Sequence, residues 1–431
     1  MISRYEIKEV SNIWDIKSKY NYFLKVELAL ISALEKNKIA PAGSMIECEK
    51  AVINIERINE LELTTKHDVI AFCSSITEQI PNNVAKFFHY GVTSSDIIDT
   101  ALSLQLKDSL DIILKDVSIL LENLKELALK HKNNICMGRS HGIYAEPMSL
   151  GQKFLSYYNE LKRSYIRLQN NYNEELCCQF SGAVGNYTIL NTTIEKDAAS
   201  QLGLPVENVS TQIISKDHLS TIIHTTSQIA ICLERLAIEL RHHQRSEVGT
   251  IFEGFSKGQK GSSTMPHKKN PISSENITGL CRLLKSHSRV AEDNNLLWHE
   301  RDISHSSNER LYLPDHFGIL SYILRRMDNV ITNLYIDTDK MEQNVFDNDF
   351  YLSSYLLHQL ILKTNLSRED IYIHIQEIAF KSNEQKLSIK DLFNQKMKSL
   401  NINYTLTDIN IDELRKIYLS ETDQIFNRSL N

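Results

Sequence analysis

A segment at residues 254–271 carries side chains that could perform acid–base chemistry on an anionic compound. Glycines recur through its first half, the hydroxyls of Ser262 and Ser263 follow, and a cationic run from Lys268 leads to Asn270. Glycine permits backbone conformations that other residues avoid, and closing loops can carry catalytic groups onto a substrate. The segment therefore predicts a mobile loop in which a hydroxyl reacts while the lysine and the amide hold a negative charge.

Two other polar segments lie far from this loop in the sequence. Residues 89–96 begin with His89, and residues 138–147 contain His141. Elimination across a C–N bond needs a base for the carbon-bound proton, an acid for the leaving nitrogen and cations for the negative charge that develops. Because histidine titrates near neutrality, His141 suits the acid, and Glu275 is the candidate carboxylate to tune it.

The base is harder to supply. A serine hydroxyl must lose its proton near neutral pH, which requires strong local stabilisation of the alkoxide. Lys268 and successive N–H groups of the loop could stabilise the alkoxide of Ser262. Ser262 is therefore the candidate base, and Ser263 is the alternative.

Helices are expected to position these segments. Glycine (14) and proline (7) are scarce among the 431 residues, which disfavours a turn-rich β fold. Apolar residues recur at helical spacing over residues 96–130, 148–178, 217–248 and 273–298. A helix over the first of these stretches would measure roughly 50 Å, which is typical of a bundle. The apolar faces of these helices are wider than one neighbouring helix requires, so we also expect contacts with other subunits.

The polar segments fall at expected breaks between helices. The sequence predicts irregular structure over residues 81–95, 137–147, 181–193, 254–271 and 299–314. We expect an all-α protein with a first domain over residues 1–110, a long bundle over 111–350 and a small helical domain over 351–431.

Composition disfavours several classes of protein. The net charge of −6 argues against a general nucleic-acid surface, and no apolar run is long enough to cross a membrane. The seven cysteines are scattered without zinc-finger spacing, which favours a reducing, cytoplasmic location, and we expect Cys177 and Cys178 to be buried. His242 and His243 point to different sides of a helix, so we expect solvated residues rather than metal ligands.

The polar segments match, in the same order, the motifs of the fumarase/aspartase superfamily. Residues 261–271 read GSSTMPHKKNP, which closely resembles the superfamily's signature loop, and the Met-Pro-His-Lys form resembles its adenylosuccinate lyases. TKHDV at 65–69, HERDISHSS at 299–307 and LSRED at 366–370 extend the match over nearly the whole chain. The resemblance implies the superfamily's fold, a long central helical bundle flanked by two smaller helical domains.

The resemblance also implies a role for each matching residue. Ser262 would be the general base, His141 the general acid, Glu275 the residue that orients His141, and Lys268 a cation for the developing charge. The implied substrate-binding residues are His89, Thr93, Ser94, Gln212, Lys268 and Asn270 at the succinyl group, Arg4, Tyr5, Arg301, Ser306 and Arg310 at the phosphate and ribose, and His67 and Asp68 at the nucleotide. Several cations suit a phosphorylated dicarboxylate, and arginine suits bidentate phosphate contacts.

The implied reaction is β-elimination of fumarate from adenylosuccinate, giving AMP, and from succinylated aminoimidazole carboxamide ribotide in purine biosynthesis. It would need no metal, flavin or nicotinamide, and its partner would be a small-molecule nucleotide rather than nucleic acid or a membrane. The family further implies a homotetramer in which each active site draws its segments from three subunits.

Two alternatives and two departures accompany this prediction. Argininosuccinate lyase or another superfamily lyase is disfavoured by His267 and the arginine cluster, and a catalytically silent helical scaffold is disfavoured by the intact acid and base. Ser140 stands where the family usually has threonine and keeps the hydroxyl. Tyr144 stands where histidine is common, keeps aromatic bulk and loses a titratable group.

Overall fold

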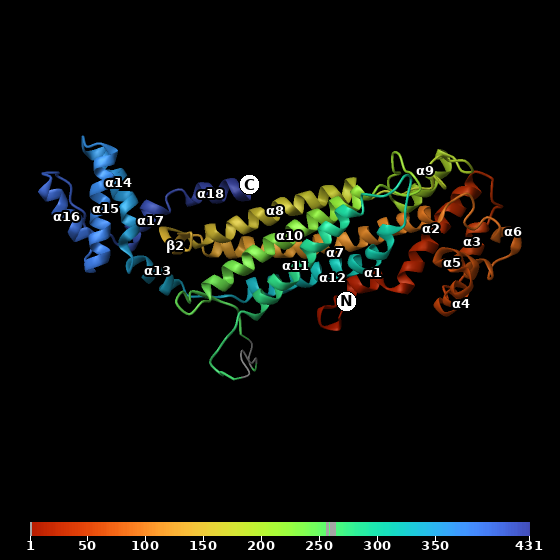
Figure 1. Ribbon diagram of the computed structural model, residues 1–431, viewed down its shortest axis with the longest axis horizontal. Helices are drawn as coiled ribbons and strands as arrows, with labels where there is room; N and C mark the ends of the chain where they lie inside the picture. The colour runs from red at the N-terminus through yellow and green to blue at the C-terminus, as the bar shows by residue number, and fades with distance from the viewer. Residues whose placement is uncertain (1, 256–257, 259–263) are drawn as a thin grey trace. The chain divides into compact units, whose positions relative to one another are not determined.

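The computed structural model describes residues 2–255, 258 and 264–431, and helices dominate this part of the chain (Figure 1). The predicted all-α class is confirmed. The α-helices of the described residues are α1 (Lys8–Trp14), α2 (Ile16–Lys36), α3 (Ser44–Glu49), α4 (Ile55–Thr65), α5 (Asp68–Thr77), α6 (Asn82–Ala85), α7 (Ser94–Lys130), α8 (Leu150–Glu174), α9 (Thr192–Leu202), α10 (Lys216–His243), α11 (Ile272–Asp293), α12 (Ser304–Thr332), α13 (Thr338–Phe346), α14 (Leu352–Lys363), α15 (Arg368–Gln385), α16 (Ile389–Ser399), α17 (Ile411–Tyr418) and α18 (Thr422–Leu430). The 3-10 helices are η1 (Ser3–Tyr5) and η2 (Asp349–Tyr351), and the short strands are β1 (Ile135–Ser140), β2 (Ile143–Ser149), β3 (Ile251–Phe252) and β4 (Tyr335–Ile336).

The chain divides into two compact units. The first comprises Met1–Leu121, Leu161–Ile238 and Ile272–Asn329, and the second comprises Glu122–Glu160, Glu239–Pro271 and Val330–Asn431. The long helices α7, α8, α10 and α12 contribute residues to both units. The three-part division at residues 110 and 350 stays a prediction.

The four long helices predicted from apolar spacing are confirmed as α7, α8, α10 and α11. On α7, Ile97, Leu110 and Val117 are completely buried. Burial of one such side chain contributes about 1.5–3 kcal/mol, so tertiary packing rather than intrinsic propensity stabilises these helices.

Hydrogen bonds join the long helices within the first unit, where they run side by side (Figure 1). Ser227 on α10 donates to the carbonyl of Leu284 on α11 over 2.9 Å. Ser321 on α12 donates to Asp116 on α7 over 2.6 Å. The apolar stripes therefore pack as a bundle that is also fixed by buried polar contacts.

Several expected breaks proved wrong in part, and the short helix α6 lies within the one expected at residues 81–95. Residues 137–147 form most of a β-hairpin, because β1 and β2 pair antiparallel from Ile135 to Ser149. Residues 304–314 belong to α12, which continues through Pro314. Proline inside a helix costs about 3 kcal/mol, and the fully buried neighbours Leu313 and Phe317 offset that cost by packing.

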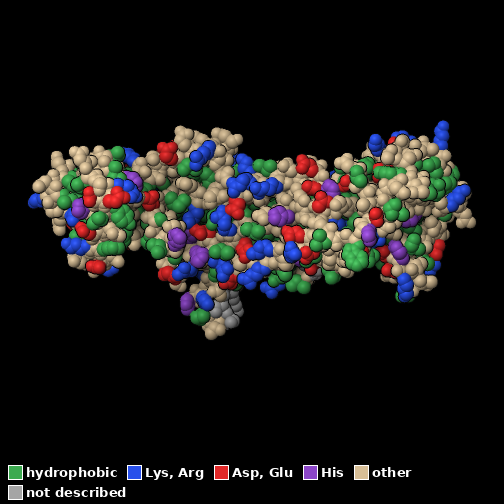
Figure 2. Space-filling view, turned by 45° about the horizontal axis from the view of Figure 1, so that its top comes forward, with side chains coloured by type: hydrophobic (Ala, Val, Ile, Leu, Met, Phe, Trp, Pro, Cys, Tyr) green, Lys and Arg blue, Asp and Glu red, His purple; other side chains and the backbone are tan. Residues whose placement is uncertain are grey.

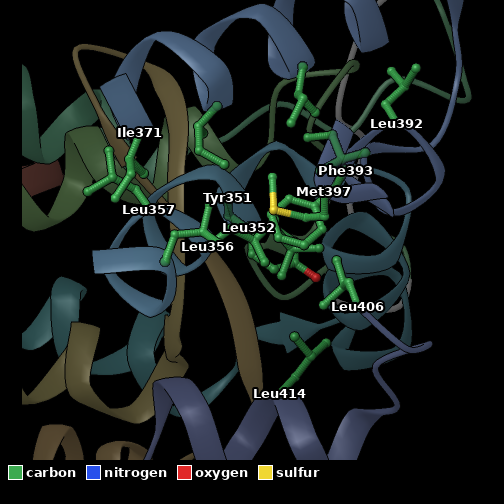
Figure 3. Close-up of a cluster of buried hydrophobic side chains, with 14 of the residues drawn as sticks. Tyr351, Leu352, Leu356, Leu357, Ile371, Leu392, Phe393, Met397, Leu406 and Leu414 are labelled. Atoms are coloured by element: carbon green, nitrogen blue, oxygen red, sulfur yellow. The ribbon is translucent and has the colours of Figure 1, made fainter. Parts of the chain in front are cut away.

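The second unit has its own apolar core, drawn in Figure 3. Leu356 of α14, Ile371 of α15 and Phe393 of α16 are completely buried in it. Ile135 and Met137 of β1 belong to the same cluster. The core therefore ties the β1–β2 hairpin to the C-terminal helices within this unit.

The prediction that His243 is solvated is wrong. Its side chain is buried, and its Nδ1 lies 2.8 Å from the Thr250 hydroxyl. The chain folds back after α10, so that the Thr250 N–H donates to the carbonyl of His243 over 3.1 Å. His242 is exposed, since adjacent helical side chains point apart. Cys177 and Cys178 are buried, as expected.

The surface carries charges of both signs. On the face drawn in Figure 2, basic and acidic side chains alternate and do not gather into one basic patch. Among the described helices, none combines the length and the apolar character that a membrane span requires.

Candidate active site

A pocket of about 320 Å³ lies in the first unit. Four residues predicted to bind the substrate line it, namely Asp68, Arg301, Ser306 and Arg310. They come from α5, from the segment before α12 and from α12 itself. The fold therefore brings together residues separated by more than 200 positions in the sequence.

Asp68 organises the cations of this pocket. Its Oδ2 accepts hydrogen bonds from Lys19 Nζ over 2.8 Å and from Arg310 Nη2 over 3.0 Å. Burial alone would raise the pKa of Asp68, but Lys19, Arg310 and the Val69 N–H outweigh it and lower that pKa. The Arg310 side chain is 57% exposed, so its other N–H groups can reach a ligand. Sequence motifs did not reveal Lys19, which lies on the amphipathic α2.

A buried ion network lies beside the cations. Lys216 Nζ is 3.4 Å from both Asp99 Oδ1 and Glu309 Oε2, and its side chain is only 5% exposed. Burial alone would lower the pKa of Lys216, but the two carboxylates outweigh it and raise that pKa. His305 Nδ1 lies 3.3 Å from Glu309 Oε2, while the buried Nε2 has no hydrogen-bond partner among the described residues. His305 itself is one of the residues that line the pocket.

His89 is held by a carboxylate that the sequence did not reveal. Glu27 of α2 is completely buried and binds His89 twice, with Oε1 2.6 Å from Nδ1 and Oε2 accepting the backbone N–H over 3.1 Å. Burial alone would lower the pKa of His89, but Glu27 and Asp96 outweigh it and raise that pKa. The backbone of His89 is left-handed, at φ 60°. A histidine whose pKa is shifted by a buried carboxylate, in a strained backbone position, is typical of functional sites.

The start of α7 brings three more predicted residues together. Ser94 Oγ lies 3.4 Å from His67 Nε2, and the Thr93 N–H donates to Asp96 Oδ2 over 2.7 Å. Burial raises the pKa of Asp96 to about 7, although N–H groups of Thr93, Ser181 and Gly182 act against it. These hydrogen bonds hold Thr93 and Ser94 at the N-terminus of α7, and a helix N-terminus favours the binding of an anion.

The remaining predicted residues of the first unit have simpler environments. Arg301 Nη1 donates to Gln212 Oε1 over 3.2 Å. The Tyr5 hydroxyl accepts from Asn276 Nδ2 over 3.4 Å, a partner that sequence motifs did not identify. Arg4 is exposed in η1, and Glu275 is exposed in the first turn of α11.

In the second unit, His141 occupies the tip of the β1–β2 hairpin. His141 and Gly142 form its two-residue loop with φ 54° and 81°, as a type I′ turn requires. The ladder shifts at Gly138, where a Cβ would lie 2.9 Å from the Glu146 carbonyl. His141 is exposed, and its side chain forms no hydrogen bond with the described residues. The position of this imidazole is therefore set by the backbone of the turn.

Tyr144 has a clear role in this hairpin. It pairs with Arg139 across the two strands, and the guanidinium lies 4.7 Å from the centre of the Tyr144 ring. This distance is within the range of a cation–π interaction. The departure from histidine at this position therefore retains an aromatic support for the hairpin.

The glycine-rich loop is described only in part. Ser262 and Ser263 lie outside the described residues. Lys268 is exposed, and its N–H donates to the Met265 carbonyl over 3.0 Å. Asn270 is partly buried near the start of α11. The assignment of the base, and the orientation of His141 by Glu275, stay predictions.

Comparisons with known proteins agree on one family. Residues 6–284 match the model of a family described as lyase. The adenylosuccinate lyases of Aquifex aeolicus and Helicobacter pylori are 41% and 40% identical over 91% and 98% of this chain, and over 90% and 95% of their own lengths. The adenylosuccinate lyase of Thermotoga maritima is 38% identical over 99% of both chains.

Solved structures support the fold. A fumarate lyase from Mesorhizobium sp. BNC1 superposes with a TM-score of 0.87 at 20% identity, covering 100% of this chain and 99% of its own. The 3-carboxy-cis,cis-muconate lactonizing enzyme of Pseudomonas putida superposes with a TM-score of 0.86 at 22% identity, covering 99% and 96%. With near-complete matches to its relatives, the chain belongs to the lyase family and, within it, to the adenylosuccinate lyases.

Proposed function

We propose that this C–N lyase removes fumarate from adenylosuccinate, and from succinylated aminoimidazole carboxamide ribotide, by β-elimination. The observation that carries the proposal is the match at about 40% identity over nearly the full length of curated adenylosuccinate lyases. The pocket also offers cations to an anionic nucleotide, since Lys19, Arg301 and Arg310 line it together with the carboxylates of Asp68, Asp99 and Glu309.

The proposed chemistry distributes the reaction between a base and an acid. Ser262 takes the proton from the succinyl carbon, and Lys268 and Asn270 stabilise the resulting aci-carboxylate. The C–N bond then breaks, and His141, oriented by Glu275, donates its proton to the leaving nitrogen. Fumarate and the free amino nucleotide are the products, so protons and electrons balance.

A steady-state assay of fumarate release tests these roles. His141→Ala and Ser262→Ala should each lower kcat by roughly 10²–10⁴-fold, as removal of a general acid or base does. His242→Ala is the matched control, because that histidine is exposed and outside the proposed site. If Ser263→Ala abolished turnover and Ser262→Ala did not, the base would be Ser263. Turnover of argininosuccinate, or no turnover by the wild type, would favour the alternative functions.

We also propose a cytoplasmic homotetramer with shared active sites. Large apolar side chains on the long helices support the assembly, since Ile166, Leu283 and Leu311 are 47%, 47% and 75% exposed in the single chain. Sedimentation should give four chains per particle. Mixing His141→Ala with Ser262→Ala should restore part of the activity, whereas mixed tetramers without any activity would contradict shared sites.

A further inference from the structure

Four side chains near the start of α10 form a cluster that the proposed reaction does not use. His218 lies in the first turn of α10, with Nδ1 2.7 Å from Glu175 Oε2 and Nε2 2.8 Å from Glu207 Oε2. The Cys177 thiol donates to the same Glu207 oxygen over 3.3 Å. Two carboxylates and a thiol therefore meet around one imidazole, all within the first unit.

The backbone fixes this arrangement. Cys178 forms a parallel bridge with Val206, in which the Cys178 N–H donates to Pro205 and the Glu207 N–H donates to Cys178, each over 2.9 Å. The bridge holds the segment after α8 against the segment after α9. Side chains of consecutive extended residues point to opposite sides, so Cys177 and Cys178 do not both face Glu207. The thiol that bonds to Glu207 is that of Cys177.

We propose that Cys177, Glu207 and His218 bind one zinc ion, with Glu175 orienting the imidazole. Zn²⁺ accepts thiolate, imidazole and carboxylate ligands in a tetrahedral arrangement. A histidine that binds zinc usually donates its other ring N–H to a carboxylate, which is the relation of His218 Nδ1 to Glu175. Three protein ligands leave a fourth position for water.

The distances are close to those that zinc requires. Tetrahedral Zn²⁺ places nitrogen and oxygen ligands about 3.4 Å apart, and sulfur and oxygen ligands about 3.6 Å apart. The corresponding separations here are 2.8 Å for His218–Glu207 and 3.3 Å for Cys177–Glu207. An opening of about 0.3–0.6 Å would therefore admit the ion. The side chains of His218 and Glu207 are 24% and 12% exposed, which gives the ion a path from solvent.

The charge of the cluster also favours a cation, since carboxylate oxygens of Glu175 and Glu207 lie 2.7 Å and 2.8 Å from the two ring nitrogens of His218. Zinc binds the thiolate, so the thiol proton of Cys177 leaves to solvent when the ion binds.

A second group of similar composition provides a contrast. Glu27, Cys73 and His89 also place their ligand atoms close together. Here the sulfur is 4.0 Å from Glu27 Oε1, and the completely buried Glu27 occupies the His89 Nδ1. The sulfur is thus farther from the carboxylate than in the Cys177 cluster, and that carboxylate is itself completely buried, so we expect no metal there. Cys73 therefore serves as a control.

The test uses the full chain, freed of metal by a chelator and titrated with Co²⁺. Thiolate ligation of Co²⁺ produces a charge-transfer band in the near ultraviolet, and Zn²⁺ displaces the cobalt. We expect one Co²⁺ per chain with this band, and its loss in Cys177→Ser. His218→Asn and Glu207→Gln should weaken binding at least tenfold, and Glu175→Gln should weaken it by roughly 10–100-fold. Cys178→Ser and Cys73→Ser should keep the band.

The wild-type titration alone can overturn the proposal, because a chain without stoichiometric Co²⁺ and without the band has no such site. A band that persists in Cys177→Ser, or that disappears in Cys73→Ser, would equally overturn it. Circular dichroism establishes that each variant is folded before its binding is compared. The measurements follow the bound metal directly, so they are independent of the proposed lyase activity.

Discussion

The pocket of the first unit and the β1–β2 hairpin of the second unit hold their polar side chains in opposite ways. In the pocket and in the ion network beside it, Asp68 and Lys216 are buried, and each binds two oppositely charged groups. On the hairpin, His141 is exposed at a turn, and its side chain forms no hydrogen bond within the described part of the chain.

This difference separates two tasks. Charges paired during folding are already oriented when a substrate arrives, and such preorganisation lowers the entropy lost on binding. An acid on a turn is placed only by the backbone, so it remains free to protonate a leaving group. Substitutions in the pocket should therefore act on stability and binding, and substitutions in the hairpin should act on kcat.

The largest effect is expected at the centre of the buried network. Lys216→Met leaves Asp99 and Glu309 buried without their cation, and removal of one partner of a buried pair costs about 3–5 kcal/mol. Urea denaturation should show this loss. Lys36→Met is the control, because the Lys36 side chain in its ion pair with Asp197 is 68% exposed, and such a surface pair contributes little to stability. Equal losses in the two variants would contradict a structural role for the buried network.

Arg310→Met should affect binding rather than chemistry. Loss of a charge-assisted contact to a phosphate costs about 1.5–3 kcal/mol, which corresponds to a KM for adenylosuccinate raised roughly 10–100-fold with little change in kcat. Arg57→Met is the control, since Arg57 also binds carboxylates, at Glu60 and Glu78, but does not line the pocket. A fall in kcat without a change in KM would break the proposed division of tasks.

The interaction of Glu27 with His89 should make the free energy of unfolding depend on pH. Because the pKa of His89 is raised in the fold, its contribution to stability is complete below the ordinary value of 6.5 and is lost as pH rises through the higher folded value. Glu27→Gln should lower the free energy of unfolding by about 2 kcal/mol near pH 6, and by less at higher pH. Glu47→Gln is the control, since its exposed pair with Lys50 should give a small loss that is constant over this range.

The sequence predicted the long helices and some of the residues of the pocket, and a physical reason can be given for each success and each omission. Apolar spacing is a local signal, so the long helices were predicted correctly. Asp68, Arg301 and Arg310 lie in motifs and were found for that reason. Lys19, which pairs with Asp68, and Lys216, which pairs with Asp99 and Glu309, were not found. Each lies on a helix distant in sequence from its partners, and an ion pair between helices leaves no local pattern.

The hairpin was missed for a different reason. Its loop reads His141-Gly142 rather than a typical Asn-Gly, Gly138 interrupts β1, and Pro147 lies within β2. Each of these residues weakens a strand prediction. The core of the second unit stabilises the hairpin nevertheless, because Ile135 and Met137 are buried in that core.

A smaller effect is expected at the turn itself. Gly142→Ala places a Cβ at φ 81°, which should destabilise the hairpin by about 1 kcal/mol and lower kcat through misplacement of His141. Gly43→Ala is a matched control, with φ 86° and equal space around the added Cβ. Both variants should lose similar stability, and only Gly142→Ala should lose activity. Loss of activity in both would mean that general instability, rather than the turn, explains the result.

The smallest effect is expected at Tyr144, where the comparison can be made sharpest. Tyr144→Leu removes the ring that Arg139 contacts, worth about 0.5–1 kcal/mol, so kcat/KM should fall by about 2–5-fold. Tyr144→Phe keeps the ring and should match the wild type, and Tyr144→His restores the residue common in the family. Equal kcat/KM for the leucine and phenylalanine variants would mean that the turn alone orients His141. The acid would then depend on no side-chain contact of the hairpin, in the strongest contrast with the paired charges of the pocket.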